Sequence, residues 1–196
     1  MSKRIEGVDV SHWNTLEKVV PYNPEFMMIK ASEGVSFRDN KAKEWVQVAS
    51  SLGIPVGFYH YARAEKNTPE DEARFFLDVV SGLKHIGECV LALDYEGKAL
   101  SVKNCDEWAN AFMMCVYNKT GVKPLLYCSQ SVVKRFPTVA SNGFGLWVAR
   151  YRNKLLGAGD IKPFKFCAMW QFTSSPVDRN IFYGSQKQFL KYAEVK

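Results

Sequence analysis

Residues 90–96 have the sequence Val-Leu-Ala-Leu-Asp-Tyr-Glu, in which four apolar residues run directly into two acids. An apolar run of this length, bounded by polar residues, predicts a strand that is buried on both faces. Side chains two positions apart on a strand point to the same side, with Cα atoms about 6–7 Å apart, so Asp94 and Glu96 would emerge together. Burying two carboxylates together is costly because each raises the pKa of the other. Glycoside hydrolysis requires such a pair, although an Asp-x-Glu can also start a solvated loop or cap a helix.

The composition indicates a folded chain with a sizeable apolar core. Of the 196 residues, 47% are hydrophobic and 14% are aromatic, which argues against intrinsic disorder. No stretch approaches the roughly 18 apolar residues of a membrane span, so we expect no membrane insertion. Residues 1–9 start with basic side chains but contain no apolar segment, so we expect no signal peptide.

The cysteines favour neither a disulfide framework nor a metal site. Five cysteines occur, and none belongs to a Cys-x-x-Cys pair. Most of them lie within apolar patterns, where a thiol behaves as a small hydrophobic group. No cluster of histidine, cysteine and aspartate has the spacing of metal ligands, and no glycine-rich phosphate loop is present. We therefore expect a chain that folds in a reducing compartment, with no metal and no cofactor.

Short apolar runs alternate with helical patterns along the chain. The predicted strands cover residues 5–10, 26–31, 54–61, 89–94, 124–128, 145–149, 166–171 and 180–183. Strand–helix alternation predicts parallel strands with right-handed crossovers, and about eight strands favour a barrel. Residues 143–183 contain strand patterns but no convincing helix. The expected fold is therefore an irregular TIM-like α/β barrel whose late strands are joined by loops.

Helix ends are marked by capping residues. Predicted helix starts are Thr68 followed by Pro69, Asn104 followed by Glu107, and Ser185 followed by Gln188. Gly53 and Gly121 are placed to end the helices that precede them. The aromatic residues Trp108 and Phe112 fall on the apolar stripe of a helix, so we expect them in the core.

Acids and aromatic side chains gather at the predicted strand ends, where barrels of this type place their chemistry. The acids are Asp9, Glu33, Asp94 and Glu96, with Asp178 before the last strand. The candidate substrate-binding side chains are Glu33, Tyr59, Tyr61, Tyr127, Trp147, Tyr151 and Gln171. Single residues have structural alternatives: Asp9 can be a buried, hydrogen-bonded acid, Asp178 can cap a turn, and Lys30 can form an ion pair with Glu33. His12 and His60 are expected to be packed and hydrogen-bonded.

Seven motifs follow one another in the order found in a known family. They are Gly7-Val8-Asp9-Val10-Ser11, Ile29-Lys30-Ala31-Ser32-Glu33-Gly34, Tyr59-His60-Tyr61-Ala62, Leu93-Asp94-Tyr95-Glu96, Leu146-Trp147-Val148-Ala149-Arg150-Tyr151, Trp170-Gln171-Phe172 and Val177-Asp178-Arg179-Asn180. On these motifs the chain resembles glycoside hydrolase family 25, the Chalaropsis-type lysozymes or N-acetylmuramidases. The departures are mild: Ser32 stands where threonine is common, and Tyr61 where phenylalanine is common.

The resemblance implies an irregular barrel of eight strands and five helices. It also implies hydrolysis of the β-1,4 bond between N-acetylmuramic acid and N-acetylglucosamine in peptidoglycan. Glu96 matches the general acid of the family, Asp94 its partner carboxylate, and Asp9 and Asp178 two further active-site acids. Asp94 would assist attack by the 2-acetamido group of the substrate, or Asp9 or Asp178 would act as base for water in an inverting route. We favour substrate assistance.

Two other classes of function compete with a hydrolase. A non-catalytic glycan-binding module would also place aromatic residues at a barrel mouth, but it would have no use for the Asp94 and Glu96 pair. A nucleic-acid binder is suggested only by the net charge of +6. Peptidoglycan is itself anionic, so we expect it as the partner, and no nucleic acid.

The resemblance also gives expectations about organisation and setting. We expect residues 1–196 to form a single catalytic muramidase domain without a separate wall-binding domain, acting as a monomer. The absence of a signal peptide fits an endolysin of the phage type, made in the host cytoplasm and released onto the wall at lysis. A piece of a longer enzyme is the alternative.

Overall fold

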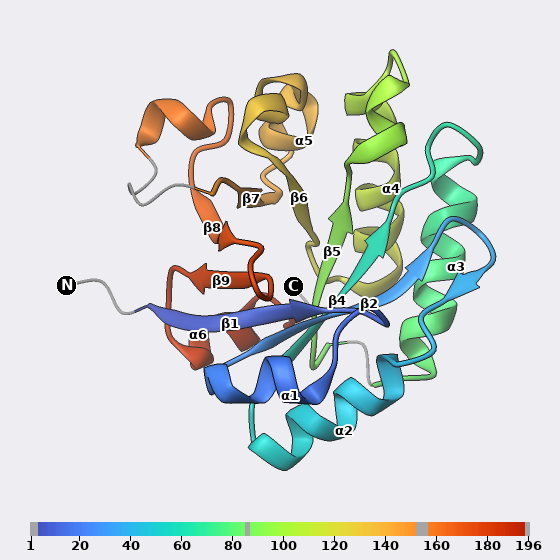
Figure 1. Cartoon of the computed structure of the whole chain (residues 1–196). Coiled ribbons are helices and arrows are strands. Elements are labelled where there is room, and N and C mark those ends of the chain that lie inside the picture. Colours follow the sequence, from blue (N-terminus) through green and yellow to red (C-terminus); the bar gives the residue numbers. More distant parts are fainter. Residues whose placement is uncertain (1–3, 85–86, 152–156, 195–196) are drawn as a thin grey trace.

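The structure is a computed structural model and describes residues 4–84, 87–151 and 157–194 (Figure 1). Its strands are β1 (Ile5–Val10), β2 (Met27–Glu33), β3 (Phe37–Arg38), β4 (Val56–Tyr61), β5 (Val90–Asp94), β6 (Leu125–Ser129), β7 (Gly145–Ala149), β8 (Cys167–Thr173) and β9 (Arg179–Phe182). Its α-helices are α1 (Leu16–Val19), α2 (Ala42–Leu52), α3 (Pro69–Ser81), α4 (Cys105–Thr120), α5 (Pro137–Ser141) and α6 (Gln186–Lys191).

Eight of these strands close into a barrel, as predicted. The strands follow the order β1-β9-β8-β7-β6-β5-β4-β2, and pairing between β1 and β2 completes the ring. The two-residue strand β3 pairs with the end of β2 and lies outside the ring. The expectation of parallel strands is wrong for β9, which is antiparallel to β1 and β8. Only residues 174–178 separate β8 from β9, and so short a connection cannot return the chain for a parallel pairing.

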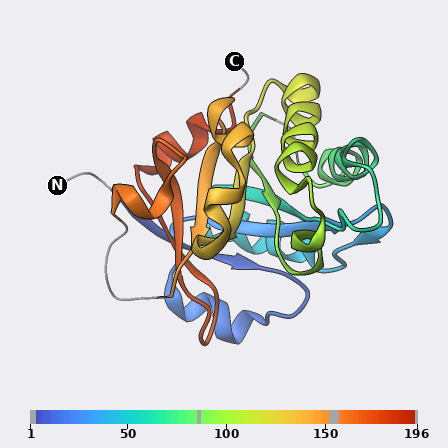
Figure 2. The ribbon, with the colours of Figure 1, turned by 90° about the horizontal axis from the view of Figure 1, so that it is seen from above.

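The longer helices lie outside the barrel. α2, α3 and α4 come after β3, β4 and β5 in the chain, and Figure 2 shows α3 and α4 side by side on one flank. Among the residues that the structure describes, no α-helix lies between β7 and β8 or between β8 and β9, as predicted, and the described part of the β7–β8 connection contains the 3₁₀ turn Ala158–Ile161. Within the described ranges, no helix is both long enough and apolar enough to cross a membrane.

Most of the predicted helix ends are confirmed. The Thr68 hydroxyl accepts a hydrogen bond from the amide of Asp71, and Ser185 and Gln188 form a reciprocal capping box. Gly53 and Gly121 end α2 and α4 with φ of +64° and +70°. Asn104 is at the N-cap of α4, as predicted, but its side chain makes no capping hydrogen bond.

The barrel wall separates two apolar clusters. The inner cluster has residues from strands around the ring and is closed at the amino-terminal end by Phe26 and Phe189, whose ring centroids lie 4.9 Å apart. The outer cluster packs the other strand faces against the helices, and includes Trp108 and Phe112 as predicted. In β5, Ala92 belongs to the inner cluster and Leu91 and Leu93 to the outer one, as the alternation of strand side chains requires.

A buried polar network ties β2 and β4 to α3. His60 is fully buried, with Nδ1 2.8 Å from Ser32 Oγ and Nε2 2.9 Å from Glu72 Oε2. The Glu72 carboxylate also accepts hydrogen bonds from the Arg63 amide and, at 2.7 Å, from Asn67 Nδ2. Burial lowers the pKa of His60, which favours the neutral ring. His60 is therefore a packed and hydrogen-bonded residue, as expected from the sequence.

Removing the carboxylate of this network is predicted to destabilise the fold. Glu72→Ala leaves the Arg63 amide, Asn67 and His60 without their buried acceptor and should lower the free energy of unfolding by about 3 kcal/mol. Urea unfolding followed by circular dichroism measures this loss. Glu70→Ala, an exposed change on the same helix, is the control, with an expected effect of about 0.5 kcal/mol or less. Equal effects of the two substitutions would contradict the role of the network.

Candidate active site

A polar cavity of about 300 Å³ opens at the carboxyl ends of the parallel strands. We call it the acidic cavity. Its lining consists of Asp9, Ser11, Trp13, Lys30, Tyr59, Tyr61, Asp94, Glu96, Tyr127, Trp147, Tyr151, Gln171 and Asp178. It thus unites all the candidate residues predicted from the sequence except Glu33. The cavity is also lined by Ser11, Trp13 and Lys30, which were not among the site residues predicted from the sequence.

The end of β5 places the two acids through strand alternation. Asp94 is the last residue of β5 and points inward, like Ala92 two positions earlier. Tyr95 points outward and is fully buried, with its ring 5.7 Å from that of Trp108. Glu96 returns to the cavity side. The buried Tyr95 ring thus anchors the short segment between the two acids.

Gly97 lets the chain turn away directly after the second acid. Its φ of +57° lies in the left-handed region, which disfavours residues with a side chain. A Cβ at this position would also lie 2.5 Å from the hydroxyl of Tyr61. Both constraints require glycine, so the Tyr61 hydroxyl can lie against the backbone next to Glu96.

Asp9 is held by side chains from the last two strands. Its Oδ2 accepts hydrogen bonds from Gln171 Nε2 at 2.8 Å and from Asn180 Nδ2 at 2.7 Å. Gln171 Oε1 in turn accepts hydrogen bonds from the hydroxyls of Tyr127 and Tyr151, at 2.9 and 2.7 Å. This network fixes one face of the acidic cavity. Asp9 is therefore a buried, hydrogen-bonded acid, which was one of the two possibilities that the sequence left open.

Asp178 lies beside Asp9. Its backbone carbonyl accepts a hydrogen bond of 3.2 Å from the Asp9 amide, just before β9 begins. Burial raises the pKa of Asp178 to about 7, and the charges of Asp9 and Glu96 add to the shift. Burial also raises the pKa of Asp9 to about 6, against the hydrogen bonds from Asn180 and Gln171. These two acids therefore titrate close to neutral pH.

The carboxyl groups of Asp94 and Glu96 also have raised pKa values. Burial is the largest cause for both, and the charge of Glu96 contributes further for Asp94. Lys30 acts in the opposite direction on both acids. Burial, and not a neighbouring negative charge, is thus what raises the pKa of Glu96.

One oxygen of Asp94 has an unused hydrogen-bonding capacity. Asp94 is only 6% exposed, and its Oδ1 is buried with no hydrogen-bond partner among the described residues. A buried carboxylate oxygen normally accepts at least one hydrogen bond. Because Asp94 lines the acidic cavity, a donor on a bound molecule can supply the missing one.

Lys30 and Glu33 form the ion pair that the sequence left open. Lys30 Nζ lies 2.6 Å from Glu33 Oε2, and Arg63 Nε donates to the other carboxylate oxygen at 2.7 Å. The Lys30 ammonium also lies over the ring of Tyr61, 4.8 Å from its centroid. Glu33 is therefore engaged in holding Lys30, which itself lines the cavity.

The two tryptophans of the acidic cavity differ in exposure. Trp147 is 1% exposed and donates from Nε1 to Asn180 at 2.8 Å, so its ring forms part of the packed floor. Trp13 is 81% exposed and rests on His12, with ring centroids 4.6 Å apart. His12 is positioned by Asp39, whose Oδ2 lies 2.8 Å from His12 Nδ1. Trp13 is thus a supported aromatic surface at the cavity edge.

The chemistry of the acidic cavity is that of acids held in different environments. Asp9 has a fixed orientation, Asp94 has a free oxygen, and Glu96 is less deeply buried than either. In the described ranges, no group of three or more histidine, cysteine, aspartate or glutamate side chains is placed to hold a metal ion. Acids with raised pKa values next to aromatic surfaces are groups of the kind that proton transfer uses.

The chain is similar to a known protein family and to several known proteins. The family model described as "Glycosyl hydrolases family 25" matches residues 8–181. The autolytic lysozyme of Clostridium acetobutylicum is 31% identical over 65% of this chain, and the lysozyme of Streptococcus phage Cp-7 is 29% identical over 90% of it. The chain spans 38% and 50%, respectively, of the lengths of these relatives.

A solved structure has the same fold over nearly the whole length of this chain. The muramidase from Acremonium alcalophilum superposes with a TM-score of 0.82 at 24% identity, covering 98% of this chain and 100% of that one. The family match covers most of the described barrel, including the strands that place Asp9, Asp94 and Asp178. The chain therefore belongs to glycosyl hydrolase family 25.

Proposed function

We propose that the chain is a lysozyme that hydrolyses the β-1,4 bond between N-acetylmuramic acid and N-acetylglucosamine in peptidoglycan. The decisive observation is the pair Asp94 and Glu96 at the end of β5, both in the acidic cavity and both with a raised pKa. Membership of family 25 and relatives named lysozyme support the same activity. A glycan-binding module would not need this costly pair of buried acids.

In the first step, Glu96 donates its proton to the oxygen of the glycosidic bond as that bond breaks. Burial raises the pKa of Glu96, as a general acid working near neutral pH requires. The carbonyl oxygen of the substrate's 2-acetamido group forms the new bond to the anomeric carbon. In the second step, water replaces this oxygen, and Glu96 takes the proton from the water.

Asp94 would act on the acetamido group. Its free Oδ1 can accept a hydrogen bond from the acetamido N–H, which orients the group and stabilises the positive charge that develops on it. Such a bond favours the ionised form of Asp94 and lowers its pKa. Substrate binding would therefore favour ionised Asp94, while Glu96 keeps the proton that the reaction needs.

The remaining residues would hold the saccharide. The Tyr127 and Tyr151 hydroxyls and Gln171 form one connected group beside Asp9, which fixes the shape of the cavity. The exposed ring of Trp13 offers a flat surface to a sugar ring at the cavity edge. The four carboxyl groups of the cavity disfavour a phosphate backbone, in agreement with a glycan as substrate.

The setting proposed for this activity is the bacterial cell wall. The described part of one chain completes the ring of strands and lines the acidic cavity, so we propose that the chain acts as a monomer. Relatives include phage lysozymes, which supports an enzyme of the endolysin type, made in the host cytoplasm and acting on the wall after release.

Product analysis tests the bond that is cleaved. Purified peptidoglycan should yield fragments with N-acetylmuramic acid at the new reducing end, identified by mass spectrometry after borohydride reduction. New ends at N-acetylglucosamine would show a different cleavage and contradict the proposal.

The first predicted variant removes the general acid. Glu96→Gln should lower the rate of peptidoglycan hydrolysis by about two to four orders of magnitude, because the amide cannot donate the proton. The variant should keep the thermal unfolding midpoint of the parent chain within a few degrees. Glu107→Gln, an exposed change on α4, is the matched control and should retain full activity. Near-normal hydrolysis by Glu96→Gln would refute the assignment.

The second variant tests the balance of charge in the cavity. Lys30 lowers the pKa values of Asp94 and Glu96, because a positive charge stabilises both carboxylates. Lys30→Met removes that charge, so both pKa values rise and both limbs of the pH–rate profile should move to higher pH. The profile of kcat/KM against pH measures the shift. Lys98→Met, an exposed change two residues after Glu96, should leave the profile in place, and a shift to lower pH in Lys30→Met would contradict the argument.

The third variant tests the aromatic cavity edge. Trp13→Ala should raise KM for polymeric peptidoglycan about three- to tenfold with kcat changed less than about twofold, because the lost stacking acts on binding. Trp13→Phe should recover most of the affinity. Leu16→Ala, a nearby exposed apolar change, is the control. A large loss of kcat in Trp13→Ala with KM unchanged would exclude a binding role.

A further inference from the structure

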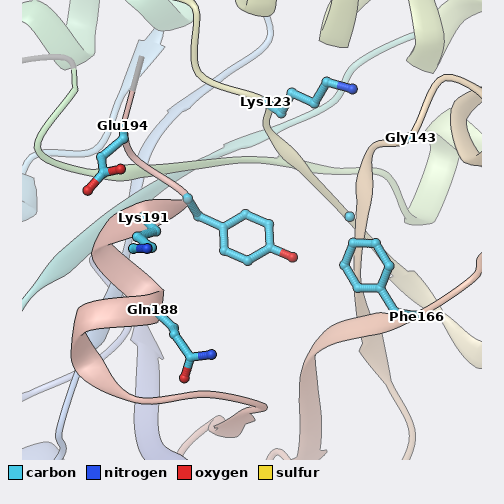
Figure 3. A pocket seen from close by; sticks show the side chains of 8 residues that line it. Lys123, Gly143, Phe166, Gln188, Lys191 and Glu194 are labelled. Carbon is cyan, nitrogen blue, oxygen red and sulfur yellow. The ribbon is translucent and has the colours of Figure 1, made fainter. Parts of the chain in front are cut away.

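The end of the barrel opposite the acidic cavity contains a second pocket, of about 620 Å³ (Figure 3). We call it the basal pocket. Its lining consists of Lys123, Gly143, Gly145, Phe166, Gln188, Lys191, Tyr192 and Glu194. Lys123 and Phe166 precede β6 and β8, and Gly145 starts β7, so the pocket lies at the amino-terminal ends of these strands. None of its residues takes part in the proposed reaction.

The shape of the basal pocket depends on Gly145. A Cβ there would lie 2.6 Å from Leu125 Cδ2 and 3.4 Å from the ring of Tyr192. In Figure 3, Gln188 and Lys191 of α6 face the pocket from one side, and Lys123 and Phe166 lie across from them. Helix α6 is fixed in place because Phe189 packs against Phe26 and Phe182 of the inner cluster. The pocket is therefore a feature of the packed barrel end.

Hydrogen-bond donors outnumber acceptors in the basal pocket. Among the described residues, the Lys191 ammonium and the Tyr192 hydroxyl have no hydrogen-bond or ion-pair partner. Lys123 Nζ donates to the Asn142 carbonyl at 3.0 Å and has further donor capacity. The one acid in the lining is Glu194. These groups suit a ligand that is rich in acceptors and negatively charged.

Phe166 adds an apolar surface to this set of donors. It is 46% exposed, so its ring offers a face on which a sugar can stack. Together, the two ammonium groups, a phenol and an aromatic ring match a saccharide that bears carboxylates. The identification of this saccharide as peptidoglycan rests on the proposed lysozyme activity.

We propose that the basal pocket is a second, non-catalytic binding site for peptidoglycan, which holds a glycan strand through its sugar rings and stem-peptide carboxylates. Because it lies at the opposite end of the barrel, it would engage a strand other than the one being cleaved. Attachment at one end raises the local concentration of wall polymer at the other, which increases retention on the wall without changing the chemical step.

Wall retention of pocket variants tests the proposal. Each substitution is made in the Glu96→Gln background, so that the walls stay intact, and the bound fraction is measured by co-sedimentation with purified peptidoglycan. Lys191→Glu and Phe166→Ala should each weaken binding about fivefold or more. Lys187→Glu changes the charge equally on the same helix but lies outside the pocket lining, and should weaken binding less than about twofold. Equal losses for Lys187→Glu and Lys191→Glu, or no loss in the pocket variants, would overturn the proposal.

Two further measurements separate the alternatives. With Glu96 intact, Lys191→Glu and Phe166→Ala should cleave short soluble fragments at the unaltered rate, and a parallel loss there would indicate a general structural effect. Mild acid removes phosphodiester polymers from the walls, and Lys191→Glu should still bind these treated walls more weakly than the parent chain does. If the difference disappears, the ligand of the pocket is those polymers and not peptidoglycan. Absence of cleavage in the parent chain would refute the proposed function, whereas loss of pocket-dependent retention would refute only this inference.

Discussion

One carboxylate oxygen of Asp9 accepts hydrogen bonds from two side-chain amides. These bonds connect the start of the chain to its end. Gln171 and Asn180 donate these bonds from β8 and β9, and β9 is the strand that closes the ring against β1. A carboxyl group buried to this depth needs such donors, since its desolvation is otherwise uncompensated. The same two strands therefore close the ring and hold the acid of the cavity in place.

The interior of the barrel is divided along its axis. Towards the amino-terminal end it is filled by apolar and aromatic side chains such as Met28, Val90 and Phe182, with Phe189 of α6 closing that end. Towards the carboxyl end the inward positions become polar, and Asp94 follows Ala92 on the same face of β5. The apolar half contributes to the burial that stabilises the fold, while in the polar half burial raises the pKa values of four acids. Stability and reactivity thus have the same physical source.

Local pattern predicts the parts of this arrangement that depend on strand period and capping. The alternation in residues 90–96 is sufficient to place Asp94 and Glu96 together, and glycine or threonine at helix ends predicts the limits of α2 and α3. The antiparallel direction of β9 is not predicted, because it depends on how a short connection can join two neighbouring strands. Asn180 is missed as a partner of Asp9 because 171 residues separate them along the chain. Trp13 is missed because its exposure depends on the loop path after β1.

The contrast between Trp13 and the other tryptophans has a spectroscopic consequence. Trp45, Trp108, Trp147 and Trp170 are at most 7% exposed, whereas Trp13 stands largely in water at the cavity edge. Aqueous quenchers such as acrylamide would therefore act on one indole far more than on the others. The fluorescence of Trp13 therefore reports whether a saccharide is bound in the acidic cavity, without any added label. A sugar ring that covers Trp13 would shift its emission to shorter wavelength and shield it from the quencher.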